Sequence, residues 1–316
     1  MIQTPGWLEK CLANPAITDL CLSAEQIAVD QGQGMEVLDD LRWDEGDLKN
    51  WLLFQLSKTG KSWDAKNPYI DAGIFLGQPF RLHAVFPPVS PSGILISLRR
   101  LPQAQVDNAR WARDPYFEAL GQIVQRGETL LISGSTGSGK TTLASELLSL
   151  VSPRERILAI EDTAELAPHH PQFFSLLSRP PNADGFGEVS LRQILKQTLR
   201  MRPDRIVLGE CRGPEVLELL QALNTGHRGT IATLHANSPR EALRRIELLC
   251  LLSSPLTLPT VRELLALGVQ WIVQVERTPQ GRVIKELVQV AGKEGDTLLL
   301  RPHSVQNRMS RSPATV

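Results

Sequence analysis

Hydrophobic positions in the later part of the chain alternate between two spacings. From Glu128 onward, the apolar run TLLIS precedes helical spacing over 141–150, RILAIE and a loop precede a second helical stretch over 191–199, and RIVLGE comes next. Short apolar strands that alternate with helices are typical of a layered α/β domain whose sheet is largely parallel. This part of the chain is therefore predicted to have that architecture.

The first hundred residues follow a different pattern. Leucine and tryptophan recur at helical spacing over 48–56, and a glycine-rich turn signal stands at 31–34. The segments PFRLHAVFPP and GILISLRRLP have the composition of two strands that end at prolines. This mixture predicts a small domain that combines helices with strands.

Together the patterns predict an α/β chain of two domains. We expect a small N-terminal α/β domain over 1–103, a linker over 104–111 and the parallel-sheet domain over 112–302. The final segment, 303–316, has no periodicity and is predicted to be a disordered tail. A length of 316 residues is sufficient for two such domains.

Charge and cysteine content exclude some classes of function. Lysine plus arginine equals aspartate plus glutamate at 34 each, whereas a protein that binds nucleic acid usually has a basic excess, so nucleic acid is an unlikely partner. None of the four cysteines stands in a CxxC pair, which argues against zinc. The N-terminus lacks the pattern of a signal peptide, and charges and prolines interrupt the apolar stretch 246–267. We expect a cytoplasmic protein that docks on a membrane at most.

A phosphate-binding loop is the clearest motif of the sequence. The segment GSTGSGKT, from Gly134 to Thr141, fits G-x-x-x-x-G-K-[ST], with a predicted strand before it and a predicted helix after it. Backbone N–H groups of such a loop and the positive end of the helix dipole bind phosphate oxygens. Lys140 is expected to reach the β- and γ-phosphates of ATP, and the Thr141 hydroxyl to bind Mg²⁺. A turn that binds no ligand is the alternative.

Acidic residues follow two of the later predicted strands. Glu210 ends the run RIVLGE, and the segment EDTAE, with Glu161, Asp162 and Glu165, follows the strand RILA. Ligands bind at the carboxyl ends of the strands in open parallel sheets, so acids at these places are candidates to hold Mg²⁺ through water and to orient the attacking water. Each acid alone is about as well explained as a helix cap or a solvated loop charge.

Two histidines lie in the segment GHRGTIATLHANS. His227 stands in a glycine-bounded turn, and His235 follows the predicted strand TIATL. A lone histidine is more often a surface or core residue than a catalytic one. Because His235 ends a strand of the same sheet, it is the stronger candidate to contact the γ-phosphate.

These motifs together resemble the ATPase superfamily of type II and type IV secretion systems and type IV pili. Four boxes occur in the family's order: Walker A (GSTGSGKTT), an Asp box (IEDTAEL), a Walker B box that ends in Gly-Glu (RIVLGE) and a His box (TGHRGTIATLHANSP). The intervening sequence resembles the tight-adherence (Flp-type) pilus ATPase branch, the CpaF-like proteins. The tetracysteine zinc insertion of some branches is absent. The resemblance implies a PAS-like N-terminal domain and a RecA-like ATPase domain.

The resemblance also implies a role for each matching residue. Glu165 would polarise the attacking water with support from Glu161 and Asp162, Glu210 would act near Mg²⁺ through water, and His227 and His235 would read the nucleotide state. The residues of the Walker A box that are expected at the nucleotide are Gly134, Ser135, Thr136, Gly137, Ser138, Gly139, Lys140, Thr141 and Thr142.

Arginines complete the site in this family. The strand ISLRR resembles the one whose arginine reaches the nucleotide, which makes Arg99 or Arg100 the candidate and Arg81 a weaker one. Three further arginines, in the stretch LRMRPDR, are expected either to contact phosphate or a neighbouring subunit or to be surface charges: Arg200, Arg202 and Arg205.

The family further implies a machine and its partners. Its members form hexameric rings that bind ATP and Mg²⁺ and pass force to an inner-membrane platform protein, so this chain is expected to be a peripheral inner-membrane ATPase that powers pilus assembly or secretion. Two other hypotheses stay open. One is a different P-loop enzyme, such as a helicase or a small-molecule kinase, and the other is a nucleotide-gated scaffold without catalysis.

Overall fold

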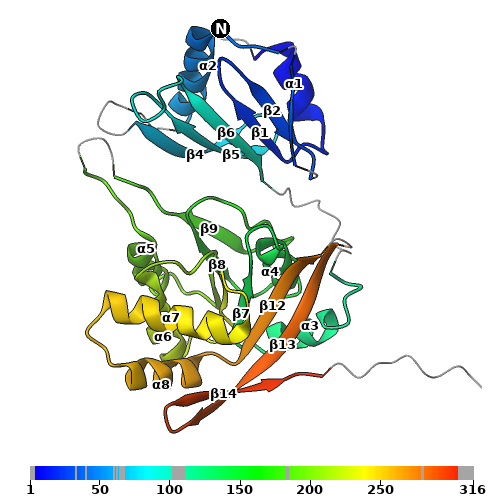
Figure 1. Cartoon of the computed structure of the whole chain (residues 1–316). Coiled ribbons are helices and arrows are strands. Elements are labelled where there is room, and N and C mark those ends of the chain that lie inside the picture. The colour runs from blue at the N-terminus through cyan, green and yellow to red at the C-terminus, as the bar shows by residue number, and fades with distance from the viewer. Residues whose placement is uncertain are drawn as a thin grey trace, which may run out of the picture. The chain divides into compact units, whose positions relative to one another are not determined.

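The fold comprises two compact units (Figure 1). The computed structural model describes residues 4–32, 34–39, 41–59, 61, 63, 68–101, 111–181, 185–278 and 281–304. The N-terminal unit is Met1–Gln103 together with Thr163–Glu165 and Arg179–Val189, and the C-terminal unit is the remainder of the chain. Most of the predicted linker and tail, 104–110 and 305–316, lies outside the described residues.

In its described residues, the N-terminal unit contains two helices and a six-stranded antiparallel sheet in the order β3-β2-β1-β6-β5-β4. Its elements are α1 (Gly6–Ala13), β1 (Asp19–Leu22), β2 (Ile27–Asp30), β3 (Met35–Val37), α2 (Glu45–Ser57), β4 (Tyr69–Phe75), β5 (Pro79–Val85) and β6 (Leu95–Arg100). The two predicted strands of this region are β5 and β6, and the predicted helix lies within α2.

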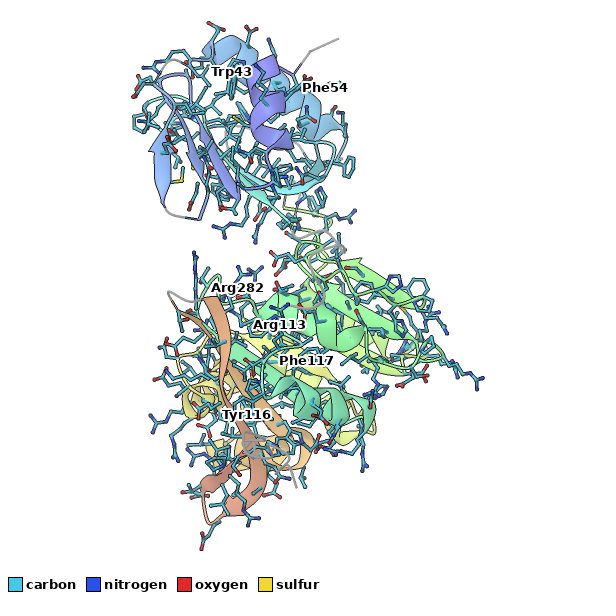
Figure 2. All side chains as sticks on the ribbon, turned by 90° about the vertical axis from the view of Figure 1, so that its right-hand side faces the viewer. Trp43, Phe54, Arg113, Tyr116, Phe117 and Arg282 are labelled. Carbon is cyan, nitrogen blue, oxygen red and sulfur yellow. The ribbon has the colours of Figure 1, made fainter. Side chains whose placement is uncertain are left out.

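Alternation along the strands gives this sheet one apolar face. In β5, Phe80 and Leu82 are buried in the core, whereas Arg81 and His83 lie on the opposite face. Both helices pack on the apolar face. Trp43, labelled in Figure 2, stands just before α2, and its ring lies 5.3 Å from that of Trp7 in α1. The opposite face of the sheet is therefore polar.

The C-terminal unit is built on an eight-stranded sheet in the order β14-β13-β12-β7-β11-β10-β8-β9. The strands from β9 to β12 in this order are parallel, and β12, β13 and β14 pair antiparallel. The strands are β7 (Leu130–Gly134), β8 (Ile157–Glu161), β9 (Phe173–Leu177), β10 (Arg205–Leu208), β11 (Ile231–Leu234), β12 (Trp271–Thr278), β13 (Gly281–Glu294) and β14 (Thr297–Pro302).

Helices connect the parallel strands and cover the sheet (Figure 1). They are α3 (Phe117–Gln125), α4 (Lys140–Leu148), α5 (Leu191–Thr198), α6 (Glu215–Asn224), α7 (Pro239–Ser253) and α8 (Leu258–Gly268). The strands β7, β8, β10 and β11 are buried along their whole length, because helices flank them on both faces. The predicted fold class, a small N-terminal α/β domain and a mainly parallel α/β domain, is confirmed.

Two predictions need correction in detail. Trp111, which the sequence placed in the linker, is buried in the core of the C-terminal unit. The antiparallel strands β12 to β14 were not predicted. No helical pattern in the sequence stands between these strands to divide the apolar region into separate elements. In the part of the chain that the structure describes, every helix is too short or too polar to cross a membrane.

Candidate nucleotide-binding site

The predicted phosphate loop connects β7 to α4, so it lies at the carboxyl edge of the parallel strands. Glycines shape it for steric reasons. Gly137 and Gly139 have φ angles of 72° and 99°, in the left-handed region that side chains disfavour. A Cβ atom on Gly134 would collide with the carbonyl oxygen of Val275 in the neighbouring β12. The loop thus has the backbone that its sequence predicts.

Lys140 begins α4 and is buried, with 7% of its surface exposed. Its Nζ donates to the carbonyl oxygens of Gly134 at 3.0 Å and Ser135 at 2.9 Å, and it also lies 3.1 Å from Nδ1 of His235. These contacts hold the ammonium group inside the concave side of the loop. A cation in this position is suited to bind phosphate oxygens.

His235 follows β11 and stands between a cation and an anion. Its Nδ1 faces Lys140, and its Nε2 lies 3.4 Å from Oε1 of Glu210, which follows β10. Because an ammonium group only donates, Nδ1 accepts and the proton of neutral His235 lies on Nε2, toward Glu210. Burial, and then the charge of Lys140, lower the pKa of His235, whereas Glu210 raises it. The net effect holds the pKa of His235 below its ordinary value, which favours the neutral ring.

The acids of the Asp box have different neighbours. Glu161 is buried and accepts from the backbone N–H of Leu166 at 2.8 Å and from the Ser175 hydroxyl at 2.6 Å. Asp162 accepts from the Ser178 hydroxyl at 2.5 Å and pairs with Arg212. Both carboxylates hold the segment after β8 in place.

Glu165, the third acid of the box, is grouped with the N-terminal unit. Its carboxylate lies 3.7 Å from the guanidinium of Arg81 in that unit. Within the C-terminal unit, the structure brings Glu210 to His235 and His235 to Lys140.

The residues present fit a nucleotide with Mg²⁺. Among the described residues, the buried Ser138 hydroxyl in the middle of the loop has no hydrogen-bond partner, which fits a group that can bind a phosphate oxygen. Thr141, at the start of α4, and Glu210 supply a hydroxyl and a carboxylate, which are hard oxygen donors of the kind Mg²⁺ prefers.

The structure separates the two histidines that the sequence grouped together. His227 precedes β11 and His235 follows it, so the strand lies between them. The backbone N–H of His227 donates to Ala222 at the end of α6, and its carbonyl accepts from the Thr230 hydroxyl. His227 is thus part of the turn at the amino end of β11, away from Lys140.

The arginines of the ISLRR strand are engaged within the N-terminal unit. Arg100, the first candidate, donates to the backbone carbonyls of Leu12, Asn14 and Ile17 at 2.8–2.9 Å, and its guanidinium lies over the ring of Phe80. Burial lowers the pKa of Arg100. The side chain ties the end of α1 to the sheet, and the expectation that Arg100 is the catalytic arginine stays a prediction.

Arg99 and Arg81 form ion pairs on the polar face of the same sheet. Arg99 lies 2.7 Å from Asp19, and Arg81 binds Asp71 with both Nε and Nη2, the shorter distance being 2.7 Å. Both pairs are partly exposed, with 62% of the Arg99 side chain accessible. The side chains of these two arginines are paired with carboxylates, whereas that of Arg100 is engaged by backbone carbonyls.

The arginines of LRMRPDR lie at the amino end of the strands. Arg205, at the start of β10, is buried and its Nε lies 2.5 Å from the carboxylate of Glu155. The side chain of Arg202 is 84% exposed. Arg205 therefore has a structural role, and the expectation of a phosphate contact by Arg205 needs correction.

Two further residues reach the loop and were missed by the sequence analysis. Arg282, at the start of β13 and labelled in Figure 2, donates from Nε to the carbonyl oxygen of Gly137 at 3.2 Å. Arg245, on α7, lies beside the loop in a pocket with His235. Neither residue belongs to one of the four sequence boxes of the family. Arg282 is brought to the loop by the pairing of β13, and Arg245 by the face of α7 on which it stands.

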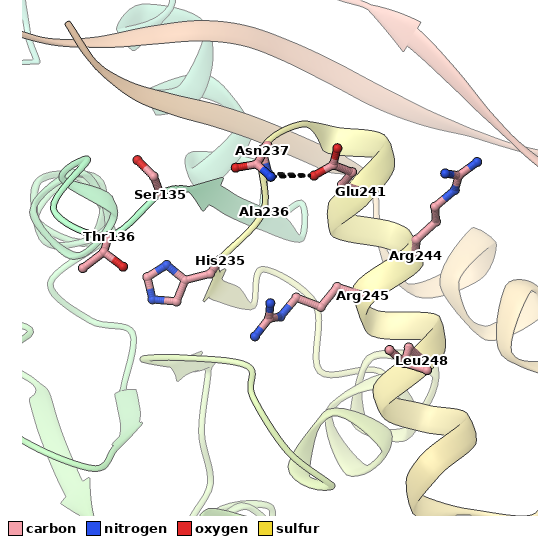
Figure 3. A pocket seen from close by; sticks show the side chains of 9 residues that line it. All are labelled: Ser135, Thr136, His235, Ala236, Asn237, Glu241, Arg244, Arg245 and Leu248. Carbon is pink, nitrogen blue, oxygen red and sulfur yellow. Dashed lines mark hydrogen bonds between the residues drawn. The ribbon is translucent and has the colours of Figure 1, made fainter.

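The pocket lies along one side of the phosphate loop and has a volume of about 580 Å³ (Figure 3). Its walls come from the start of the loop, from the end of β11 and from the first turns of α7. The lining residues are Ser135, Thr136, His235, Ala236, Asn237, Glu241, Arg244, Arg245 and Leu248.

Comparisons with known proteins place the chain in a family. The model of the family "Type II/IV secretion system protein" matches residues 79–290. A putative conjugal transfer protein of Mycobacterium tuberculosis is 42% identical over 296 residues, which cover 90% of this chain and 83% of the relative. The conjugal transfer protein TrbB of Rhizobium radiobacter is 32% identical over 72% of this chain and 70% of its own length.

The fold comparison agrees with the sequence. The solved structure of the ATPase DotB of Legionella pneumophila superimposes with a TM-score of 0.63 over 91% of this chain and 81% of its own, at 20% identity. The relatives do not test the tight-adherence branch, which stays a prediction. The chain therefore belongs to the type II/IV secretion system protein family, and its fold is that of the solved structure of DotB.

Proposed function

We propose that this chain is the motor ATPase of a pilus-assembly or secretion machine, a cytoplasmic homo-hexamer that acts on an inner-membrane platform protein. The observation that carries the catalytic part is the row Lys140, His235 and Glu210 at the carboxyl edge of the sheet, next to the phosphate loop. The family assignment supports ATP-driven secretion or conjugation. The hexamer and the platform protein rest on the resemblance of the four boxes.

The first task of the site is to bind the phosphates. The backbone of the loop, the N-terminus of α4 and the ammonium group of Lys140 form a positive cradle for the β- and γ-phosphates. The hydroxyls of Ser138, Thr141 and Thr142 supply further contacts at the start of the helix. Mg²⁺, held by Thr141 and through water by Glu210, would neutralise phosphate charge in the transition state.

The second task is to direct a water molecule at the γ-phosphorus. The new bond joins the water oxygen to that phosphorus, the bond to the β–γ bridging oxygen breaks, ADP leaves, and the water proton passes to a basic oxygen. We assign the orientation of this water to Glu210, because it is the carboxylate that the structure shows beside His235. Glu165, which the resemblance favours for this role, remains a second candidate.

Neutral His235 connects the two tasks. Its Nδ1 accepts from Lys140 while its Nε2 faces Glu210, so a movement of Lys140 toward a γ-phosphate changes the position of the carboxylate through one ring. Such a connection reports the nucleotide state to the acid that acts on water. This role does not require His227, which lies at the other end of β11.

Steady-state phosphate release by the purified full chain tests the proposal. Turnover should require Mg²⁺, stop when EDTA is added, and rise with protein concentration as the mass in solution increases toward six subunits. A chain that binds ATP but releases no phosphate at any concentration, with or without lipid and platform protein, would support the scaffold hypothesis instead.

A further inference from the structure

Two neighbouring arginines of α7 line the pocket beside the phosphate loop. The helix begins at Pro239, after Ser238, whose side chain caps it by accepting from the backbone N–H of Glu241. Its opposite face, with Ala242, Leu243, Ile246 and Cys250, is buried against the rest of the unit. The helical phase therefore leaves Arg244 and Arg245 exposed on the pocket side.

The directions of the two arginines differ. In Figure 3, the side chain of Arg245 extends from α7 toward His235, whereas that of Arg244 extends away from the phosphate loop. Among the described residues that line the pocket, the other charged residue is Glu241, and its carboxylate accepts from the side chain and the backbone N–H of Asn237. Arg245 is thus the cation directed at the space next to the loop.

Arg245 has no ion-pair partner among the carboxylates of the described residues, in contrast to Arg81 and Arg99. An arginine that faces a pocket without such a partner is free to bind an anionic ligand. A guanidinium suits phosphate in particular, because two of its parallel N–H groups match two phosphate oxygens.

We propose that Arg245 contacts the terminal phosphate of bound ATP from within the same chain, and that Arg244 does not take part. The inference rests on the proposed nucleotide site and adds an arginine to it. Its guanidinium would approach from α7, on the side of the loop opposite to the helix that Lys140 begins. There it would stabilise the charge that develops on the γ-phosphate during transfer.

The environment of His235 supports this placement. Three charged groups face its ring from different elements: Lys140 from α4, Glu210 after β10 and Arg245 from α7. Arg245 lowers the pKa of His235, although by less than burial and Lys140 do.

Affinity for two nucleotides separates a γ-phosphate contact from a general effect. In the full chain, Arg245→Ala should weaken binding of a non-hydrolysable ATP analogue by about tenfold or more and lower kcat by about 10²- to 10³-fold. Binding of ADP, which lacks the γ-phosphate, should stay within about twofold, since the loop and Lys140 are intact. Arg245→Lys should recover part of the loss in kcat, and Arg244→Ala should resemble the unchanged protein.

Several outcomes would overturn the inference. The first is that Arg245→Ala and Arg244→Ala have the same nucleotide affinities and the same kcat. The second is that Arg245→Ala weakens the binding of ADP as much as that of the ATP analogue. The third is that the loss of turnover disappears when the variant and the unchanged protein are compared at the same oligomer mass, which would place Arg245 at an interface between copies. Lys140→Ala, measured beside them, tests the underlying site. If Lys140→Ala kept full turnover, the nucleotide site itself would be wrong, whereas loss in Lys140→Ala with normal Arg245→Ala would refute only the role of Arg245.

Discussion

The amino and carboxyl ends of the parallel strands in the C-terminal unit both carry charged residues, but these residues have different roles. At the amino end, Arg205 pairs with Glu155 and fills the space between turns, so that a Cβ atom on Gly229 would collide with its guanidinium. At the carboxyl end, Lys140, His235 and Glu210 form a row beside an open pocket. Arg205 at the first end is buried beside its carboxylate, whereas the row at the second end adjoins a pocket that can hold a ligand.

Residue type alone therefore does not indicate function in this unit. His227 and His235 belong to the same box of the sequence, yet a four-residue strand separates them. Because all the strands from β9 to β12 run in the same direction, the end of the strand at which a residue stands decides whether it can reach the phosphate loop. Substitutions at both ends can therefore test whether the position of a residue along the strand decides its role.

The largest effect is expected at Lys140. Lys140→Ala removes the cation inside the loop, so we expect loss of most ATP binding and a fall in turnover of about 10²-fold or more. Isothermal titration and phosphate release measure the two quantities. Lys285→Ala is the matched control, since this lysine of β13 forms an exposed ion pair with Glu276 and should leave both unchanged. Tight ATP binding by Lys140→Ala would refute the phosphate role.

A smaller effect is expected at one of the two histidines. His235→Gln removes the ring between Lys140 and Glu210, and we expect turnover to fall by about 10- to 100-fold. His227→Gln should stay within about twofold, because its position lies at the amino end of β11. Comparable losses of turnover per folded molecule in both variants would remove the distinction between the two ends.

The pH dependence of kcat/KM provides a second test of the difference between His235 and His227. Neutral His235 accepts from Lys140, so kcat/KM should fall as the pH drops through the pKa of His235. Burial and Lys140 hold that pKa below its ordinary value, and the acidic limb should therefore lie below about pH 6.5. His235→Gln should lose this limb, whereas His227→Gln should keep it. A limb that survives in His235→Gln would belong to another group.

The smallest effect on turnover is expected at Arg205. Arg205→Met leaves the carboxylate of Glu155 without its partner, so the free energy of unfolding should decrease by about 3 kcal/mol. Turnover per folded molecule should not change. Arg202→Ala, at an exposed position nearby, should alter stability by less than about 0.5 kcal/mol. A normal stability with reduced turnover in Arg205→Met would return Arg205 to the catalytic site.

Local patterns predicted the parts of the fold and site that depend on neighbours in sequence. The glycines of the phosphate loop, the strand before it and the helix after it identify Lys140 and Thr141, because loop geometry and sequence are coupled within a few residues. The alternation in β5 and β6 likewise revealed strands with one buried face. These predictions needed no knowledge of distant contacts.

Contacts between distant segments could not be predicted in this way. Arg100 belongs to a strand that resembles a catalytic one, yet one carbonyl near the end of α1 and two from the segment after it accept its hydrogen bonds. Arg245 stands in an ordinary helix, and only the packing of α7 in the tertiary structure places it in the same pocket as His235. The pairing of β12 with β7, which brings Arg282 to the loop, also depends on tertiary structure.

The carboxylate of Glu210 offers the most direct test that catalysis occurs at the carboxyl end of the strands. Glu210→Gln keeps the shape of the side chain but removes its charge, so ATP affinity should stay within about threefold while turnover falls by about 10²-fold or more. Binding and phosphate release are measured on the same preparation. Retained binding with lost turnover is the result that the row Lys140–His235–Glu210 predicts, and unchanged turnover in Glu210→Gln would contradict it.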